Sequence, residues 1–396
     1  MKFAEAAASV APVERHPQGW EPGITWSSTG GEIIAKVGAD SPEMDPALWA
    51  LLIEDWGLDP AITEVVPDSV QIRAWDAQVG AGQTIRAKYY RAAIRMRRNA
   101  QTPLEVAELH RVINKRTIRK ATPADGDMAF VVNLSDWQIG KGEGGGSAAT
   151  VARIIDALDA AVLRLRELRR CGRKVSTVVL MGMGDLAEGC FGHYPSQPFT
   201  VDMSRREQLQ TVRMLIARAI DLFADLADRV VLGAVPGNHG ENRSNGKAVT
   251  VVSDNDDLAV VEQVGEALAQ NPARFGHVEV VLADGLVLTL DLCGVVVGWT
   301  HMHQGPGSGQ AKIEAWWRAQ VMGRQPISDA QILNTAHFHH FLLSESTGRT
   351  VIQQPAMDGG SRWWTDKTGQ SSPTGMVTYL AGAACGQRGW QDLAIL

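Results

Sequence analysis

The sequence is poor in cysteine, and its four cysteines lie far apart. Cys171, Cys190, Cys293 and Cys385 form no C-x-x-C pair, which excludes a zinc ribbon and a thioredoxin-type redox site. Four cysteines in a chain of 396 residues do not make a disulfide framework either. We therefore expect a protein of a reducing compartment.

Long apolar runs are missing as well. The most apolar stretch, residues 285–299, is interrupted by Asp291, and its density of Val and Leu predicts two buried strands rather than a membrane span. Near the N-terminus, Glu5 interrupts a short Ala-rich run, which argues against a signal peptide. These features predict a cytoplasmic protein that makes no membrane contact.

The chain also lacks an excess of positive charge, since 38 Lys and Arg stand against 44 Asp and Glu. This balance argues against a protein that coats nucleic acid with its whole surface. The charges are unevenly spread, because residues 1–85 hold four basic and thirteen acidic residues, whereas residues 86–120 hold eleven basic and two acidic ones. The basic segment 86–120 could follow a nucleic-acid backbone or dock on the acidic residues 1–85, and the sequence leaves both open.

A turn-rich stretch at residues 123–126 predicts a boundary between an accessory α+β region, residues 1–125, and a catalytic domain, residues 126–396. The accessory region is expected to contain a loosely packed arm, a short helix, a β-hairpin and two basic helices, at residues 1–40, 45–57, 70–89, 91–98 and 103–119 respectively. In the catalytic domain, apolar strands at 130–134, 175–181 and 230–235 alternate with helices at 147–170 and 204–226, and mostly strands follow. This βαβαβ order predicts an α/β fold.

Polar residues follow five of the predicted strands: Asp136-Trp137-Gln138, Gly184-Asp185, Gly237-Asn238-His239, Thr300-His301 and His337-Phe338-His339. Ligands of α/β sheets bind where strands end, and Asp, Asn and His side chains coordinate divalent ions. His337 and His339, two residues apart on a strand, are expected to point to the same face. Each signal alone has an ordinary explanation as a helix cap, a turn or a core histidine, but five in this order are hard to explain by coincidence.

This set resembles the calcineurin-like metallophosphoesterase superfamily, whose pattern is D-x-H, then GD, then GNH, then a lone His, then G-H-x-H. The resemblance covers residues 128–345 and extends at most to residue 382. Within the superfamily, the sequence is most similar to the nuclease branch, which includes a double-strand-break repair nuclease and bacteriophage metallophosphoesterases. It implies a four-layer αββα sandwich of two mixed β-sheets flanked by helices.

The resemblance also implies two divalent metal ions and assigns residues to them. The first ion would be held by Asp136, Gln138, Asp185 and His339. Asp185 would bridge to the second ion, which Asn238, His301 and His337 would complete. His239 would not bind a metal ion. It would stabilise or protonate the leaving oxygen, so that His239 and Asp185 would be the catalytic residues.

The sequence departs from the family pattern at the first ion. Gln138 stands where the family has His, and because a Gln carbonyl is a weak ligand for a hard ion, Mn²⁺ or Mg²⁺ should be favoured over Zn²⁺, with Fe²⁺ also open. The first ion could instead be lost. Glu188, three residues after Asp185, matches a commonly acidic position, either orienting a ligand or lying solvated in a loop.

The activity that the resemblance implies is phosphodiester hydrolysis by water that two metal ions activate. No side-chain nucleophile is then needed, and the sequence contains neither a G-x-S-x-G nor a Walker A pattern. The most specific expectation is a DNA exo- or endonuclease of phage or prophage recombination or repair. Arg243 and Lys247 could contact its phosphates or be ordinary surface charges. A small-molecule nucleotide phosphatase or phosphodiesterase, and an inactive metal-binding scaffold, are the alternatives, and a homodimer is left open.

Overall fold

A computed structural model of the chain describes residues 16–27, 30–38, 44–58, 60, 63–79, 83–96, 126–244, 246–305, 307, 309–361, 365–367, 369 and 371–396. The chain divides into two compact units, Met1–Asn99 with Pro195–Thr200 and Ala100–Tyr194 with Val201–Leu396. The domain boundary expected near residue 125 falls outside the described residues and stays a prediction.

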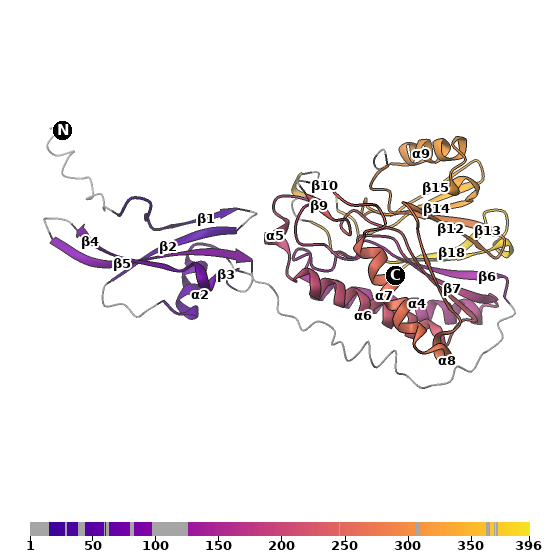
Figure 1. The fold of residues 1–396 in the computed structure, drawn as a ribbon, viewed down its shortest axis with the longest axis horizontal. Coiled ribbons are helices and arrows are strands. Elements are labelled where there is room, and N and C mark those ends of the chain that lie inside the picture. Colours follow the sequence, from indigo (N-terminus) through magenta and orange to yellow (C-terminus); the bar gives the residue numbers. More distant parts are fainter. Residues whose placement is uncertain are drawn as a thin grey trace. The chain divides into compact units, whose positions relative to one another are not determined.

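The N-terminal unit contains an antiparallel sheet, and the helix α2 packs against it (Figure 1). Its strands are β1 (Gly23–Ser27), β2 (Gly30–Gly38), β3 (Thr63–Val65), β4 (Gln71–Val79) and β5 (Gln83–Met96), and its helix is α2 (Pro46–Asp55). The expected hairpin is confirmed, because β4 pairs antiparallel with β5. The expected helix is confirmed too, since the Asp45 side chain caps it and Pro46 occupies its first turn.

Two predictions for this unit were wrong. The segment expected as a loose arm, residues 1–40, contains β1 and β2, whose Ile33 is fully buried. The segment expected as a basic helix, residues 91–98, is a strand as far as Met96. Its apolar residues recur at every second position, with Ala92 and Ile94 in the core, and this period of two belongs to a strand. The second expected helix, residues 103–119, lies outside the described residues.

The first sheet of the C-terminal unit has the order β11-β8-β7-β6-β17-β18. The strands are β6 (Met128–Leu134), β7 (Val175–Gly182), β8 (Arg229–Ala234), β11 (Val278–Leu282), β17 (Val377–Ala381) and β18 (Trp390–Ile395). The first four are parallel to one another, and β17 and β18 are antiparallel to their neighbours. The central strands are buried on both faces, which explains their continuous apolar sequences.

The second sheet has the order β12-β13-β14-β16-β15. Its strands are β12 (Val287–Leu292), β13 (Val295–Thr300), β14 (Ile332–Thr335), β15 (Leu342–Ser346) and β16 (Arg349–Gln353). The described helices of the unit are α4 (Gly146–Arg170), α6 (Arg205–Ala224), α7 (Asp256–Ala269), α8 (Pro272–Phe275) and α9 (Gln310–Met322). The short helix α5 (Gln197–Thr200) is grouped with the N-terminal unit.

Three apolar clusters define the layers of this unit (Figure 1). Phe130 and Leu180 pack with α4, α6 and α7 on one face of the first sheet. Val131 and Val179, one residue away on the same strands, pack against the second sheet, and Trp317 of α9 packs on that sheet's outer face. The α/β fold with an αββα sandwich is confirmed. Among the described residues, no helix is both long and apolar enough to span a membrane.

Candidate active site

The two sheets bring their strand ends to one place. Because β6, β7 and β8 are parallel neighbours, the loops that carry Asp136, Asp185 and Asn238 leave the same edge. Strands β13 and β14 are parallel neighbours in the second sheet and deliver His301 and His337. The approach is close, since a Cβ on Gly237 would lie 2.3 Å from the backbone nitrogen of Asp185, so that only glycine fits there.

Five of the predicted site residues adopt left-handed backbone conformations. These are Asp136 (φ 46°), Gln138 (φ 43°), Asp185 (φ 53°), His337 (φ 75°) and His339 (φ 56°). Non-glycine residues rarely adopt positive φ, and such strain collects at functional sites. The backbone turns these side chains back toward one another instead of letting the chain continue outward.

The prediction that His337 and His339 share one face of a strand was wrong. Strand β14 ends at Thr335, and both histidines lie in the turn that follows. They face different partners: the rings of His337 and His301 are 5.1 Å apart between centroids, whereas His339 Nε2 lies 3.4 Å from Asp136 Oδ1. The turn therefore sends one histidine to each half of the site.

The first half, the histidine subsite, comprises Asp185, Asn238, His301 and His337. The candidate ligand atoms of Asp185, His301 and His337 all lie within 4.8 Å of one another. The His301 Nε2 atom is 3.0 Å from Asp185 Oδ2 and 3.1 Å from Asn238 Oδ1, while the His301 Nδ1–H group donates to the Met183 carbonyl at 2.8 Å. That bond fixes the ring and directs Nε2 into the cluster.

The electrostatics of the histidine subsite favour a cation. Burial lowers the pKa of His301, but the Asp185 carboxylate outweighs it and raises that pKa to about 9. Burial and the neighbouring His301 lower the pKa of His337 to about 4, so His337 offers a neutral ring. A neutral imidazole, an amide oxygen and a carboxylate suit a divalent ion of borderline softness, and these residues fit one.

The second half, the lysine subsite, comprises Asp136, Gln138, His339, Lys141 and Asp358. Lys141 Nζ donates to Gln138 Oε1 at 3.2 Å and forms an ion pair with Asp358. Asp358 Oδ2 is 3.6 Å from His339 Nδ1. Burial opposes the charge of Lys141, but Asp358 and Glu188 raise its pKa, so the side chain is an ammonium. The Asp136 Oδ1 atom is buried and has no hydrogen-bond partner among the described residues.

His239 is anchored beside the two subsites. Its backbone N–H donates to Asp185 Oδ1 at 2.7 Å, and its Nδ1–H donates to the Glu188 carbonyl at 2.7 Å. The ring stacks on His193, with centroids 4.5 Å apart. Burial lowers the pKa of His239, but the carboxylates of Glu188 and Asp185 raise it overall. Glu188 is buried rather than solvated, so its carboxylate acts on this ring.

A buried carboxylate at the start of α7 ties two of the loops together. Asp257 accepts backbone N–H bonds from Asp185 (3.1 Å), Leu186 (2.9 Å) and Gly237 (3.0 Å). Burial and the charge of Asp185 raise the pKa of Asp257 to about 6. Asn255 caps the helix, and the Asp257 carboxylate joins the loops that follow β7 and β8.

The two predicted phosphate-binding residues lie in the two-stranded ribbon of β9 (Arg243–Ser244) and β10 (Lys247–Ala248). Arg243 Nε forms a 2.7 Å ion pair with Glu241, whereas Lys247 is exposed. The other carboxylate oxygen of Glu241 lies 3.1 Å from His303 Nε2. Arg243 is thus engaged within its own loop.

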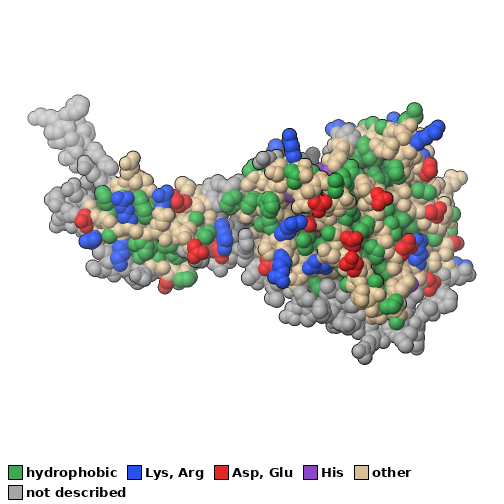
Figure 2. Space-filling model, in the orientation of Figure 1, with side chains coloured by type: hydrophobic (Ala, Val, Ile, Leu, Met, Phe, Trp, Pro, Cys, Tyr) green, Lys and Arg blue, Asp and Glu red, His purple; other side chains and the backbone are tan. Residues whose placement is uncertain are grey.

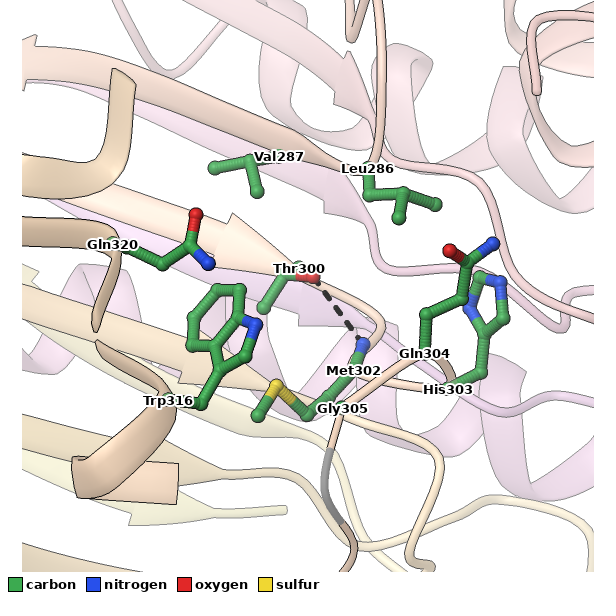
Figure 3. A pocket seen from close by; sticks show the side chains of 9 residues that line it. All are labelled: Leu286, Val287, Thr300, Met302, His303, Gln304, Gly305, Trp316 and Gln320. Atoms are coloured by element: carbon green, nitrogen blue, oxygen red, sulfur yellow. Dashed lines mark hydrogen bonds between the residues drawn. The ribbon is translucent and has the colours of Figure 1, made fainter. Parts of the chain in front are cut away.

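A cavity of about 250 Å³ lies next to the histidine subsite. Figure 3 shows the Trp316 indole and the Met302 side chain facing the Leu286 and Val287 side chains across it. His303 belongs to its wall, and the ring centroids of His303 and His301 are 5.5 Å apart. The cavity therefore offers an apolar wall close to candidate metal ligands.

Sequence reasoning missed Lys141 and Asp358. Lys141 lies three residues after Gln138, directly before a Gly-rich stretch at residues 142–146. Asp358 precedes Gly359-Gly360, far along the chain and after the last histidine of the motif. A lysine three residues from an atypical ligand is a usable signal, but the return of Asp358 is not visible in the sequence.

No protein-family model matches the sequence, and no curated protein matches it. Solved structures similar to this chain include a predicted phosphoesterase from Streptococcus pneumoniae (12% identity, 68% of this chain and 89% of that chain, TM-score 0.27). An archaeal phosphodiesterase is 10% identical over 67% of this chain and 99% of its own, with a TM-score of 0.30. Vps29 from Entamoeba histolytica in complex with Zn²⁺ is 13% identical over 67% and 98%, with a TM-score of 0.28. At identities and TM-scores this low, these similarities say nothing about the function of this chain.

Proposed function

We propose that this protein is a metal-dependent phosphodiester hydrolase. The observation that carries the proposal is the histidine subsite, in which ligand atoms of Asp185, His301 and His337 converge at the ends of parallel strands. Asn238 Oδ1 adds an amide oxygen to the same cluster. A divalent ion bound there would polarise a phosphate group and lower the pKa of the attacking water.

The residues around the histidine subsite would handle the leaving group. His239 is held by Asp185 through its backbone and by Glu188 through its ring. The two carboxylates raise the pKa of His239, which suits a ring that gives a proton to the leaving oxygen or stabilises its negative charge. Asp185 thus serves both the candidate ion and the candidate acid.

The substrate we propose is DNA, and Mn²⁺ is the ion we propose first. Support for DNA comes from the resemblance to the nuclease branch and from the basic segment 86–120. Part of that segment has another role, because Arg91 pairs with Glu32 at 2.6 Å and Arg95 with Glu64 at 2.7 Å. On the face shown in Figure 2, basic and acidic side chains are interspersed over the described surface. Exposed Lys247 is therefore a phosphate contact to test.

A small-molecule phosphodiester is the second candidate substrate, and the cavity at His303 favours it. A pocket lined by Trp316 and Met302 could accept a nucleobase or another flat apolar group attached to a phosphate at the histidine subsite. Such a substrate would need no row of basic side chains to bind a nucleic-acid backbone.

One experiment separates these substrates. Purified full-length protein with Mn²⁺ is given single-stranded DNA, double-stranded DNA, nucleotides and a chromogenic phosphodiester. Cleavage of DNA that disappears in Asp185→Ala supports the nuclease. Hydrolysis of the chromogenic diester or nucleotides without cleavage of DNA supports the small-molecule enzyme. Full metal loading with no hydrolysis of any substrate would contradict the hydrolase and leave a metal-binding scaffold.

A further inference from the structure

The lysine subsite already contains a positive charge where the resemblance implies a metal ion. Lys141 reaches into it from the loop after β6, and its side chain is only 11% exposed. Its ammonium donates to Gln138 Oε1, the oxygen that would have to serve as a metal ligand. The residue that replaces the family histidine thus accepts a hydrogen bond from a lysine.

A second carboxylate balances this ammonium. Asp358, whose side chain is 2% exposed, forms the ion pair with Lys141 and also faces His339 Nδ1. The contacts run from Gln138 through Lys141 and Asp358 to His339. A divalent ion added among these groups would lie beside a fixed ammonium and be repelled by it.

The grouping of potential ligand atoms agrees with this arrangement. Within the described part of the chain, the histidine subsite supplies the one group of three His, Cys, Asp or Glu ligands that lie mutually close. Asp136 and His339 form only a pair, with 3.4 Å between His339 Nε2 and Asp136 Oδ1.

We propose that the protein binds one divalent ion tightly, at the histidine subsite, and that the Lys141 ammonium takes the place of a second ion at the lysine subsite. The proposal rests on the proposed function, because it concerns the same site. Lys141 is then a fixed cation that is available without metal. Gln138 is its hydrogen-bond acceptor rather than a ligand.

The opposite role for Lys141 makes the opposite prediction. If the ammonium only orients Gln138 as a ligand, the buried Asp136 Oδ1, which faces His339 Nε2, would join His339 and Gln138 on a second ion. The wild type would then bind two ions, and loss of Lys141 would weaken one of them. The two roles differ in the sign of the effect.

The test counts metal ions instead of measuring activity. Metal-free full-length protein is titrated with Mn²⁺ by calorimetry, the bound metal is quantified after buffer exchange, and electron paramagnetic resonance distinguishes an isolated Mn²⁺ from a coupled pair. We expect one tight ion and an uncoupled spectrum in the wild type. In Lys141→Met, removal of the charge should tighten a second ion about tenfold or more and introduce coupling.

Two variants control this measurement. Lys141→Arg keeps the charge and should still bind one ion, and Lys174→Met removes an exposed lysine elsewhere and should match the wild type. Two tight ions in the wild type would overturn the proposal, even if Lys141→Met fails to fold. Binding of one ion without hydrolysis of any phosphodiester would contradict the proposed function but agree with the one-ion proposal. Hydrolysis by a protein that binds two ions would support the proposed function and contradict the one-ion proposal.

Discussion

The two halves of the site lie side by side but use different chemistry. In the histidine subsite, His301, His337 and Asn238 surround a single carboxylate, Asp185. Asp185 favours a proton on His301, and a divalent ion bound there would replace that proton. In the lysine subsite, the carboxylate of Asp358 is already paired with Lys141. Neighbouring strand ends of one site can therefore either recruit a positive charge from solution or carry one in the chain.

The largest expected effect comes from the residue closest to both candidate ion and candidate acid. Asp185→Ala removes the only carboxylate of the histidine subsite and the acceptor of the His239 backbone N–H. We expect hydrolysis of a phosphodiester to fall about 1000-fold or more, to the level of chelator-treated wild type. In His239→Ala, the rate of hydrolysis should fall as far, but the variant should still bind Mn²⁺, which metal analysis would measure. Near-normal rates of hydrolysis in either variant would refute the assignment of the site residues.

A paired substitution tests whether the two halves differ as described. His337→Ala should weaken Mn²⁺ binding about 100-fold, because it removes a ligand, whereas His339→Ala should change it less than about tenfold. Calorimetric titration of both variants measures the difference. Equal losses in the two variants would erase the distinction between the subsites.

A change outside both subsites should affect the histidine subsite selectively. In the wild type, the Asp257 carboxylate accepts hydrogen bonds from the backbone N–H groups of Asp185, Leu186 and Gly237. Asp257→Asn replaces one of the accepting oxygens by an amide NH₂ group, which faces these donors and cannot accept from them. Leaving buried donors unsatisfied should cost about 2 kcal/mol in the free energy of unfolding and reduce Mn²⁺ affinity about tenfold. Chemical denaturation and calorimetry check this, with the exposed Asp159→Asn as the matched control. Unchanged metal affinity would show that the loops hold without Asp257.

The smallest expected effect concerns the substrate. If DNA binds across the site, Lys247→Ala should weaken DNA binding only a few-fold and reduce the slope of log affinity against log salt by about one. Lys174→Ala is the matched control, since it too is exposed. Fluorescence anisotropy at several salt concentrations measures both, and identical slopes would place the phosphates elsewhere.

The layered α/β fold and the polar residues at its strand ends can be predicted from the sequence alone. Apolar runs in β6, β7 and β8, and the polar residues that follow each of them, are local patterns that a window of the chain contains in full. The capping box of α6, with Ser204 and Glu207, is local in the same sense, because its two residues lie three positions apart. The prediction of a helix at residues 91–98 was wrong because the alternating apolar residues there belong to strand β5.

The division of the candidate residues between the two subsites depends on long-range contacts of the folded chain. His337 and His339 separate because each adopts positive φ in a turn, a conformation that no periodicity predicts. Asp358 meets Lys141 across 217 positions of sequence, and Asp257 meets Asp185 across 72. Burial gives these contacts their strength, because charges that water would screen must instead be balanced by whichever side chains the fold brings within reach.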